Sequence, residues 1–286
     1  MGKVQPNGKP QSIGATKLSK TGDSSASDVV ESIQDNGAFE KAARAGHFVS
    51  GLLHILIGYI AIRLAFGQGG NADQSGALAE LGEKPGGAIA LWVAFVAFVA
   101  LALWRVVEAI VGKKSDDDSG SVMDRLKAAS LALVYIVFAW TTFGFASGSG
   151  KSSGKQNASM TADLMGNGFG KFVLVVVGLV IIGVGGYHVY KGVSKNFLDD
   201  LEGYTGKTVE RLGIVGYCAK GIALIGVGAL VIAAVFTSDP SKATGMDGAL
   251  KTLGQQPFGQ VLLIVAGVGI ALYGLYSFVL ARYARM

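Results

Sequence analysis

The chain has 286 residues, of which 50% are hydrophobic and 16% are charged, and its mean hydropathy is +0.45. Soluble domains carry about a quarter charged residues and rarely contain uninterrupted apolar runs of about twenty residues. This composition excludes a soluble enzyme, a disordered protein and a receptor with a single membrane span. The formal net charge of +5 is modest. Because basic residues beside membrane spans also set orientation, this charge gives no reason to expect nucleic acid as a partner.

Residues 1–38 are polar and rich in Ser, Gly and Lys, without an apolar period. Such a segment buries too little apolar surface to offset the loss of chain entropy, so we predict a disordered tail. Six apolar stretches follow, each long enough to cross about 30 Å of hydrocarbon as a helix. We therefore predict an all-α integral membrane protein with six transmembrane helices. The stretches are residues 47–66, 87–111, 128–146, 170–190, 213–236 and 259–281.

Lysine and arginine in short loops predict how such a chain is oriented. They are concentrated in residues 112–127 and 191–212, whereas the intervening loops carry fewer of them. Lys41 and Arg44 precede the first span, and Arg282 follows the last one. We expect a multi-pass protein of the plasma membrane with both its N- and C-termini in the cytoplasm.

A unit of two spans occurs three times in the chain, at intervals of about 85 residues. An apolar, an acidic and a basic residue come just before each odd-numbered span. These triplets are Phe39-Glu40-Lys41, Met123-Asp124-Arg125 and Val209-Glu210-Arg211. We expect hairpin repeats over residues 39–114, 115–197 and 198–286.

The loops between the two spans of a repeat carry a second signature. Gly76-Ala77-Leu78 follows the first span and returns as Gly248-Ala249-Leu250 after the fifth. Because every hairpin starts on the same side of the membrane, we predict parallel repeats with pseudo-threefold symmetry about the membrane normal. Many transporters instead have inverted repeats with helices broken at the midplane. None of the spans here contains proline, so we expect no unwound substrate site.

Glycines recur at intervals of seven residues in several spans. Seven residues make about two helical turns, so such glycines lie on one face and let a neighbouring helix approach closely. We predict helix packing at Gly46, Gly51, Gly58, Gly178, Gly185, Gly216, Gly221, Gly228, Gly267 and Gly274.

Aromatic and charged residues near the span ends have a simple interpretation. Tryptophan and tyrosine at such positions are typical of an interfacial belt, which we expect to include Tyr273 and Tyr276. Arg63, near the end of the first span, is expected to reach the interface or to pair with a carboxylate of the following loop. The alternative for Arg63 is contact with a partner protein or a lipid phosphate.

Ionisable residues within spans are candidates for function because burying a charge in the membrane is costly. Arg105 and Glu108 are three residues apart, so they can pair on one helix face. Lys191 and Lys220 occupy similar depths and are expected to reach toward water. The alternative is that Arg105, Lys191 and Lys220 form a pocket for the head group of an anionic lipid.

The histidines and the cysteine give no cofactor signal. His47 and His54 share a face of the first span, but His54 is about 10 Å deeper by helical rise. We therefore expect these imidazoles, and His188, to form hydrogen bonds between helices rather than to bind haem or a metal. Cys218 is the single cysteine, which excludes an internal disulfide and a cysteine-based metal site. We predict no catalytic residue, no cofactor and no metal.

Three hairpins, each preceded by Glu-Lys, Asp-Arg or Glu-Arg, together with the Gly-Ala-Leu loop signature, resemble an actinobacterial membrane family of unknown function. The resemblance covers roughly residues 39–283. A chain of this kind and mass is also similar to an accessory subunit of the actinobacterial cytochrome bcc-aa3 respiratory supercomplex. The resemblance implies a non-catalytic accessory subunit, with membrane lipids and other integral membrane subunits as partners. Two alternatives remain, a small channel or transporter on the pseudo-threefold axis and a protein that binds anionic lipid.

Overall fold

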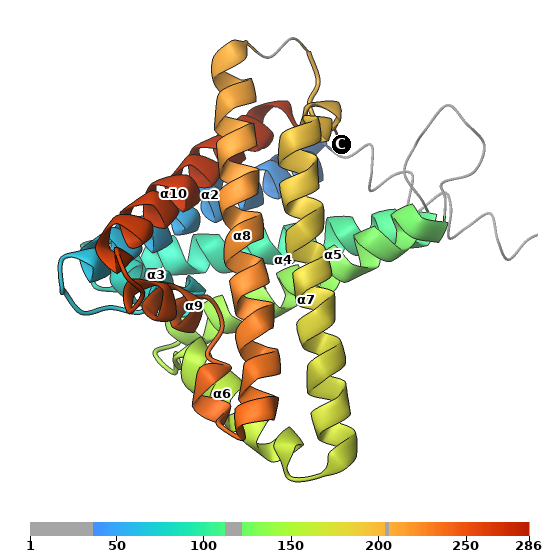
Figure 1. Cartoon of the computed structure of the whole chain (residues 1–286). Coiled ribbons are helices and arrows are strands. Elements are labelled where there is room, and N and C mark those ends of the chain that lie inside the picture. Colours follow the sequence, from blue (N-terminus) through green and yellow to red (C-terminus); the bar gives the residue numbers. More distant parts are fainter. Residues whose placement is uncertain (1–36, 112–121, 204–205, 286) are drawn as a thin grey trace, which may run out of the picture.

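The computed structural model describes residues 37–111, 122–203 and 206–285, which are predominantly helical (Figure 1). Six helices of this part of the chain are long and apolar enough to cross a membrane, so the predicted six-span fold is confirmed. The protein is therefore a multi-pass membrane protein. The six helices are α2 (Gly37–Ala65), α4 (Gly87–Val111), α5 (Val122–Ala146), α7 (Gly168–Ser194), α8 (Lys207–Thr237) and α10 (Gly259–Tyr283).

Several helices extend beyond the apolar stretches that predicted them. The expected tail, residues 1–38, lies largely outside the described residues, but its last two positions belong to α2, which begins at Gly37. α5 and α8 likewise begin several residues before their apolar runs. Alanine, lysine and glutamate favour helix, so the polar residues before a span continue the helix toward water.

Shorter helices follow each odd-numbered span, and we call the group the cap. Its members lie at one end of the molecule and are joined by hydrogen bonds. The backbone N–H of Ser153 donates to Ser75 Oγ at 3.0 Å, and that of Ala72 donates to Asp247 Oδ1 at 2.8 Å. The three hairpins therefore turn at the same end, as parallel repeats require. The cap helices are α3 (Gln74–Gly82), α6 (Ser153–Met165) and α9 (Met246–Gly254), with the short helix η2 (Pro240–Lys242) before α9.

The most extensive helix packing joins neighbouring repeats rather than the two spans of one repeat. α2 packs along α10, α7 along α8, and α4 along α5. Within repeats, α2 contacts α4 and α8 contacts α10 less extensively. The described residues of α5 and α7, which are the spans of the middle repeat, show no comparable packing on each other. The pseudo-threefold set of helix pairs is therefore left open between α5 and α7.

Glycines bring the backbones together where α2 meets α10 and where α7 meets α8. A Cβ atom on Gly51 would lie 2.7 Å from the carbonyl oxygen of Gly274, and one on Gly274 would lie 2.6 Å from that of Gly51. Side chains larger than hydrogen would separate these helices. The same reciprocal contact joins Gly58 with Gly267, Gly185 with Gly221 and Gly178 with Gly228.

Two of the predicted glycines face the other span of their own repeat. A Cβ on Gly46 would overlap the side chain of Leu101 on α4, and one on Gly216 would lie 2.6 Å from the Cα of Tyr273 on α10. Gly46 and Gly51 are five residues apart, so they point about 140° away from each other around the helix. The glycines of α2 thus serve two different contacts.

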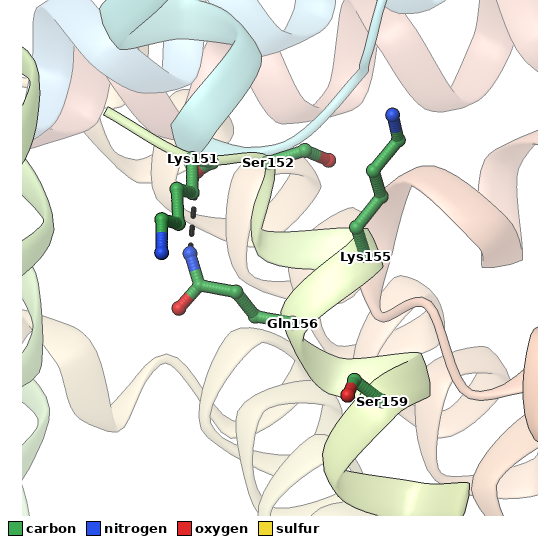
Figure 2. Close-up of a pocket in the computed structure, with 5 residues that line it drawn as sticks. All are labelled: Lys151, Ser152, Lys155, Gln156 and Ser159. Atoms are coloured by element: carbon green, nitrogen blue, oxygen red, sulfur yellow. Dashed lines mark hydrogen bonds between the residues drawn. The ribbon is translucent and has the colours of Figure 1, made fainter. Parts of the chain in front are cut away.

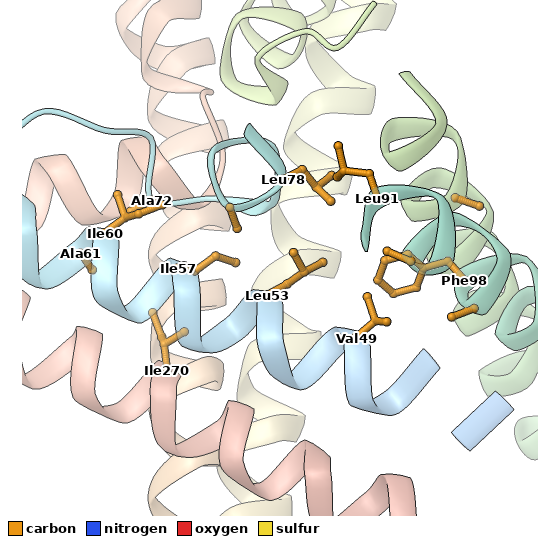
Figure 3. Packing of buried hydrophobic residues seen from close by; sticks show 14 of the residues in the cluster. Val49, Leu53, Ile57, Ile60, Ala61, Ala72, Leu78, Leu91, Phe98 and Ile270 are labelled. Atoms are coloured by element: carbon orange, nitrogen blue, oxygen red, sulfur yellow. The ribbon is translucent and has the colours of Figure 1, made fainter. Parts of the chain in front are cut away.

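Aromatic side chains fill the contact between α4 and α5 instead. Phe95 and Phe143 have ring centroids 5.5 Å apart, and those of Phe98 and Phe138 are 5.6 Å apart. The main buried cluster continues from Phe98 across α2 and into the cap (Figure 3). Its α2 members form one buried stripe at helical spacing, which consists of Val49, Leu53, Ile57, Ile60 and Ala61.

Candidate functional site

An aromatic cluster closes the end of the molecule opposite the cap, which we call the far end. The short helix η1 (Asn196–Asp200) follows α7 and places Phe197 between α8 and α10, where its side chain is 0% exposed. The ring of Phe197 stacks on Tyr217 at a centroid distance of 5.5 Å and meets the edge of Tyr276 at 5.3 Å. The Tyr276 hydroxyl donates to the Phe197 carbonyl oxygen at 3.0 Å. Tyr276 and Tyr273 are both buried within the protein, so their predicted place in an interfacial belt is wrong.

Lys220 lies beside this cluster, within the apolar part of α8. Its Nζ is 4.1 Å from the ring centroid of Tyr273, and the ring of His54 is 4.8 Å from the same tyrosine. In the described parts of the chain, the Lys220 ammonium has no carboxylate partner. An aromatic face attracts a cation but does not neutralise its charge.

Lys191 and Arg105 approach the same region from α7 and α4. Lys191 Nζ lies 2.5 Å from Asp200 Oδ2 and 5.6 Å from the ring centroid of Tyr217. Arg105 pairs with Glu108, the interaction expected from their spacing. Its Nε is buried without a hydrogen-bond partner, although the side chain as a whole is 23% exposed.

Electrostatic interactions connect Arg105 with the other groups. Arg105 and Lys220 both act on His47, and Arg105 also interacts with Asp200 and with Tyr135 of α5. We call this assembly the polar centre, and all six spans contribute to it or border it. Its members are His47, His54, Arg105, Lys191, Lys220 and Tyr273.

The position of the polar centre along the spans limits what it can bind. Arg105 and Lys220 lie about 25 Å from the cap-side ends of α4 and α8, at a rise of 1.5 Å per residue. The hydrocarbon core is about 30 Å thick, so both cations lie near its far-end boundary. Glu108 pairs with Arg105 and Asp200 with Lys191, so Lys220 has no carboxylate partner among residues 37–111, 122–203 and 206–285. A cationic site with free N–H donors suits an oxyanion such as phosphate.

The predicted hydrogen bonds between helices are wrong for two of the histidines. Nδ1 of His54 lies 2.7 Å from the carbonyl oxygen of Ser50, and Nδ1 of His188 lies 2.8 Å from that of Val184. Both contacts are made to a residue four positions earlier on the same helix. The helix backbone supplies the nearest partner for each ring. Within the described ranges, no three His, Cys, Asp or Glu residues gather in a way that could hold a metal ion.

Arg63 lies at the cap, far from the other predicted cations. Its Nη1 is 3.2 Å from Glu80 Oε2, and its Nε donates to Gln68 Oε1 at 3.1 Å. A hydrogen bond from Lys84, together with the charges of Lys84 and Arg63, holds the pKa of the Glu80 carboxyl below its usual value. Arg63 thus has partners within its own chain. This favours pairing with a loop carboxylate over contact with a partner protein or a lipid phosphate.

A pocket of about 400 Å³ lies at the start of α6 in the cap (Figure 2). Gln156 Nε2 donates across it to the Lys151 carbonyl oxygen at 3.4 Å. Both lysines that line it are exposed to solvent, where ionic contacts contribute little. We therefore place the candidate site at the polar centre. The pocket is lined by Lys151, Ser152, Lys155, Gln156 and Ser159.

Comparison with known proteins agrees with the repeats seen in the fold. The model of a family described as Domain of Unknown Function (DUF1206) matches residues 45–112, 126–195 and 215–284. The chain belongs to the DUF1206 family. Each matched segment covers most of the two long helices of one repeat, so the family model describes one repeat and this chain contains it three times.

A relative of this DUF1206 protein occurs in Bacillus. The uncharacterized protein YxxB of Bacillus subtilis (strain 168) is 29% identical over 255 residues, which cover 86% of this chain and 92% of the relative. The similarity therefore extends over nearly the whole of both proteins. No solved structure matches the chain.

Proposed function

We propose that this DUF1206 protein is a non-catalytic membrane protein whose polar centre binds an oxyanion of the phosphate type. The observation that carries the proposal is the buried Arg105 Nε, which lacks a hydrogen-bond partner. Lys220, which acts with Arg105 on His47, has no carboxylate partner in the described part of the chain. An unneutralised cation among apolar helices is costly. A bound oxyanion would accept hydrogen bonds from both side chains and balance the charge. Binding of an anionic lipid, one of the alternatives from the sequence, is a case of this chemistry.

The distribution of basic residues supports an orientation for this site. We propose that the far end faces the cytoplasm, so that both termini lie there and the cap lies outside. Lys41 and Arg44 at the start of α2 and Arg282 at the end of α10 agree with this orientation. The cytoplasmic leaflet carries the anionic lipids of many membranes, so the polar centre would lie at the level of their phosphates.

Substitution of the two cations tests the proposal. The full-length protein in mild detergent is offered phosphatidylglycerol or diacylglycerol, and native mass spectrometry measures the lipid retained. Each of Arg105→Gln and Lys220→Gln is expected to reduce retention of phosphatidylglycerol about 10- to 100-fold, the range for a hydrogen bond to a charged group. Diacylglycerol lacks the phosphate and should be retained weakly by all variants.

Charge-preserving variants provide the control. Arg105→Lys and Lys220→Arg keep the positive charge and should retain more phosphatidylglycerol than the glutamine variants do. Equal retention of the two lipids by the unmodified protein would contradict the proposal. So would unchanged retention of phosphatidylglycerol in both glutamine variants.

The uncovered faces of α5 and α7 favour a second candidate function. α7 is the least buried of the six spans, and α5 and α8, which are buried to the same extent, come next. Faces of this kind could pack against a larger membrane complex, and the resemblance noted above suggests the cytochrome bcc-aa3 supercomplex. On this proposal the protein is an accessory subunit of that complex.

Purification from the native membrane tests the accessory role. We expect cytochrome subunits to co-migrate with the full-length protein in mild detergent and to be identified by mass spectrometry. Recovery of the protein as a lone monomer would contradict this role. Ion flux through proteoliposomes of the purified protein would instead favour the channel or transporter alternative.

A further inference from the structure

We propose that the oxyanion is the head group of a phospholipid, which reaches the polar centre sideways between α5 and α7. Its acyl chains lie along the uncovered faces of these two spans. The inference rests on the proposed function, because it names the ligand of the same site and the route by which the ligand enters.

The packing of the spans determines which side of the polar centre is accessible. α8, α10, α2 and α4 form a continuous row of contacts, and the first and third repeats each hold their own two spans together. The described residues of α5 and α7 lack this packing, although they form the equivalent pair. The polar centre is therefore open on the side of the middle repeat, between α5 and α7. We call this the opening.

Arg105 interacts electrostatically with groups on both sides of this opening. It interacts with Tyr135, which lies on α5, and with Asp200, which follows α7. Its side chain remains 23% exposed although its Nε is buried. On this proposal, a ligand that enters between α5 and α7 contacts the guanidinium of Arg105.

Exposed apolar side chains lie on α7 and α5 on the cap side of the cations. Val177, Val184 and Lys191 are seven residues apart on α7 and so share one face. Lys191 belongs to the polar centre, whereas Val177 and Val184 are 42% and 45% exposed. On α5, which runs from the far end toward the cap, Val134 and Val137 are 44% and 53% exposed. A cationic end followed by exposed apolar side chains matches the two parts of a phospholipid.

The depth of the cations supports a lipid over a dissolved ion. Arg105 and Lys220 lie near the boundary of the hydrocarbon, at the level where lipid phosphates reside. A phosphate ion from water would gain nothing from the apolar faces of α5 and α7. A phospholipid would bury its chains there while its phosphate contacts the cations, so the charge and the apolar faces are used together.

A bulky residue placed on the proposed route is a test that distinguishes this inference from its alternatives. Val184→Trp enlarges a side chain on the face shared with Lys191. Leu179→Trp is the matched control, because Leu179 is 57% exposed and lies about 140° away around the same helix. The probes are dioleoyl phosphatidylglycerol and glycerophosphoglycerol, which is the same head group without chains.

Native mass spectrometry of the full-length variants gives the result. Val184→Trp is expected to lower retention of dioleoyl phosphatidylglycerol about tenfold, whereas Leu179→Trp leaves it unchanged. Glycerophosphoglycerol should bind more weakly than the lipid to every variant. Size-exclusion chromatography checks that each variant is folded, and Val177→Trp on the same face repeats the test independently.

Three outcomes would overturn the lateral route. One is full retention of the lipid by both Val184→Trp and Val177→Trp, and another is binding of glycerophosphoglycerol as tight as that of the lipid. The third is a co-purifying membrane protein that Val184→Trp releases without loss of lipid, which would place a partner helix at these faces. Loss of the preference for phosphatidylglycerol over diacylglycerol would instead overturn the proposed function itself.

Discussion

Replacing Gly58 with leucine is expected to destabilise the folded protein by about 3 kcal/mol, the upper part of the usual range for overpacking. A Cβ at this position would meet the backbone carbonyl of Gly267 and would lie 3.0 Å from the Cβ of Ala271. Neither group can move aside without shifting α10. The contact between α2 and α10 must therefore open, which thermal unfolding in detergent, followed by circular dichroism, would detect as a lower midpoint.

Gly186→Leu is the matched control for this prediction. Gly186 lies within α7, and a Cβ there would have nothing within 4 Å. Since leucine favours helix over glycine by up to about 1 kcal/mol, this variant should unfold at an unchanged or higher temperature. Equal losses for Gly58→Leu and Gly186→Leu would show that the close approach of α2 and α10 is not what Gly58 provides.

Truncating Phe197 to alanine is expected to cost about 3–5 kcal/mol, as for other large buried aromatics. The side chain is 0% exposed and is held between Tyr217 and Tyr276, so its removal leaves a cavity at the far end. Chemical denaturation monitored by tyrosine and tryptophan fluorescence would measure the loss.

A second substitution separates packing from hydrogen bonding in this aromatic cluster. Tyr276→Phe keeps the ring but removes the hydroxyl that donates to the Phe197 carbonyl, at an expected cost of about 1 kcal/mol. A loss for Phe197→Ala no larger than that for Tyr276→Phe would contradict the assignment of Phe197 as the centre of the cluster.

The spans were predictable because an apolar run of about twenty residues is a local property of the chain. The predicted span 87–111 coincides with α4 as observed. The beginnings of α2, α5 and α8 were not predicted, since their first turns are polar and resemble loop sequence. Hydropathy indicates where a helix is apolar, whereas helix propensity determines where it begins.

The glycine positions were predictable, but their partners were not. A spacing of seven residues places Gly51 and Gly58 on one face, whichever helix lies opposite. The structure pairs this face with α10, which is in another repeat and far along the chain. Nothing in the local sequence of α2 indicates that choice, and the gap between α5 and α7 was equally hidden.

For the candidate site too, some contacts were predictable from the sequence and others were not. The pair of Arg105 and Glu108 follows from a spacing of three residues on one helix. The contacts of Lys191 with Asp200 and of Lys220 with Tyr273 depend on η1 and on α10, which only the fold brings near. Phe197 was missed because it lies in a short charged connection between two spans. The one signal that could have indicated its burial was its apolar side chain in that polar segment.

The pairing of helices across repeats has a consequence for biosynthesis. α2 precedes the other five spans in the chain, and its principal partner, α10, follows them all. During synthesis the glycine face of α2 therefore lacks its partner while four further spans are inserted. A chain that carried a single repeat would lack the principal partner of each helix, and three such chains would have to associate to make the contacts that one polypeptide makes here.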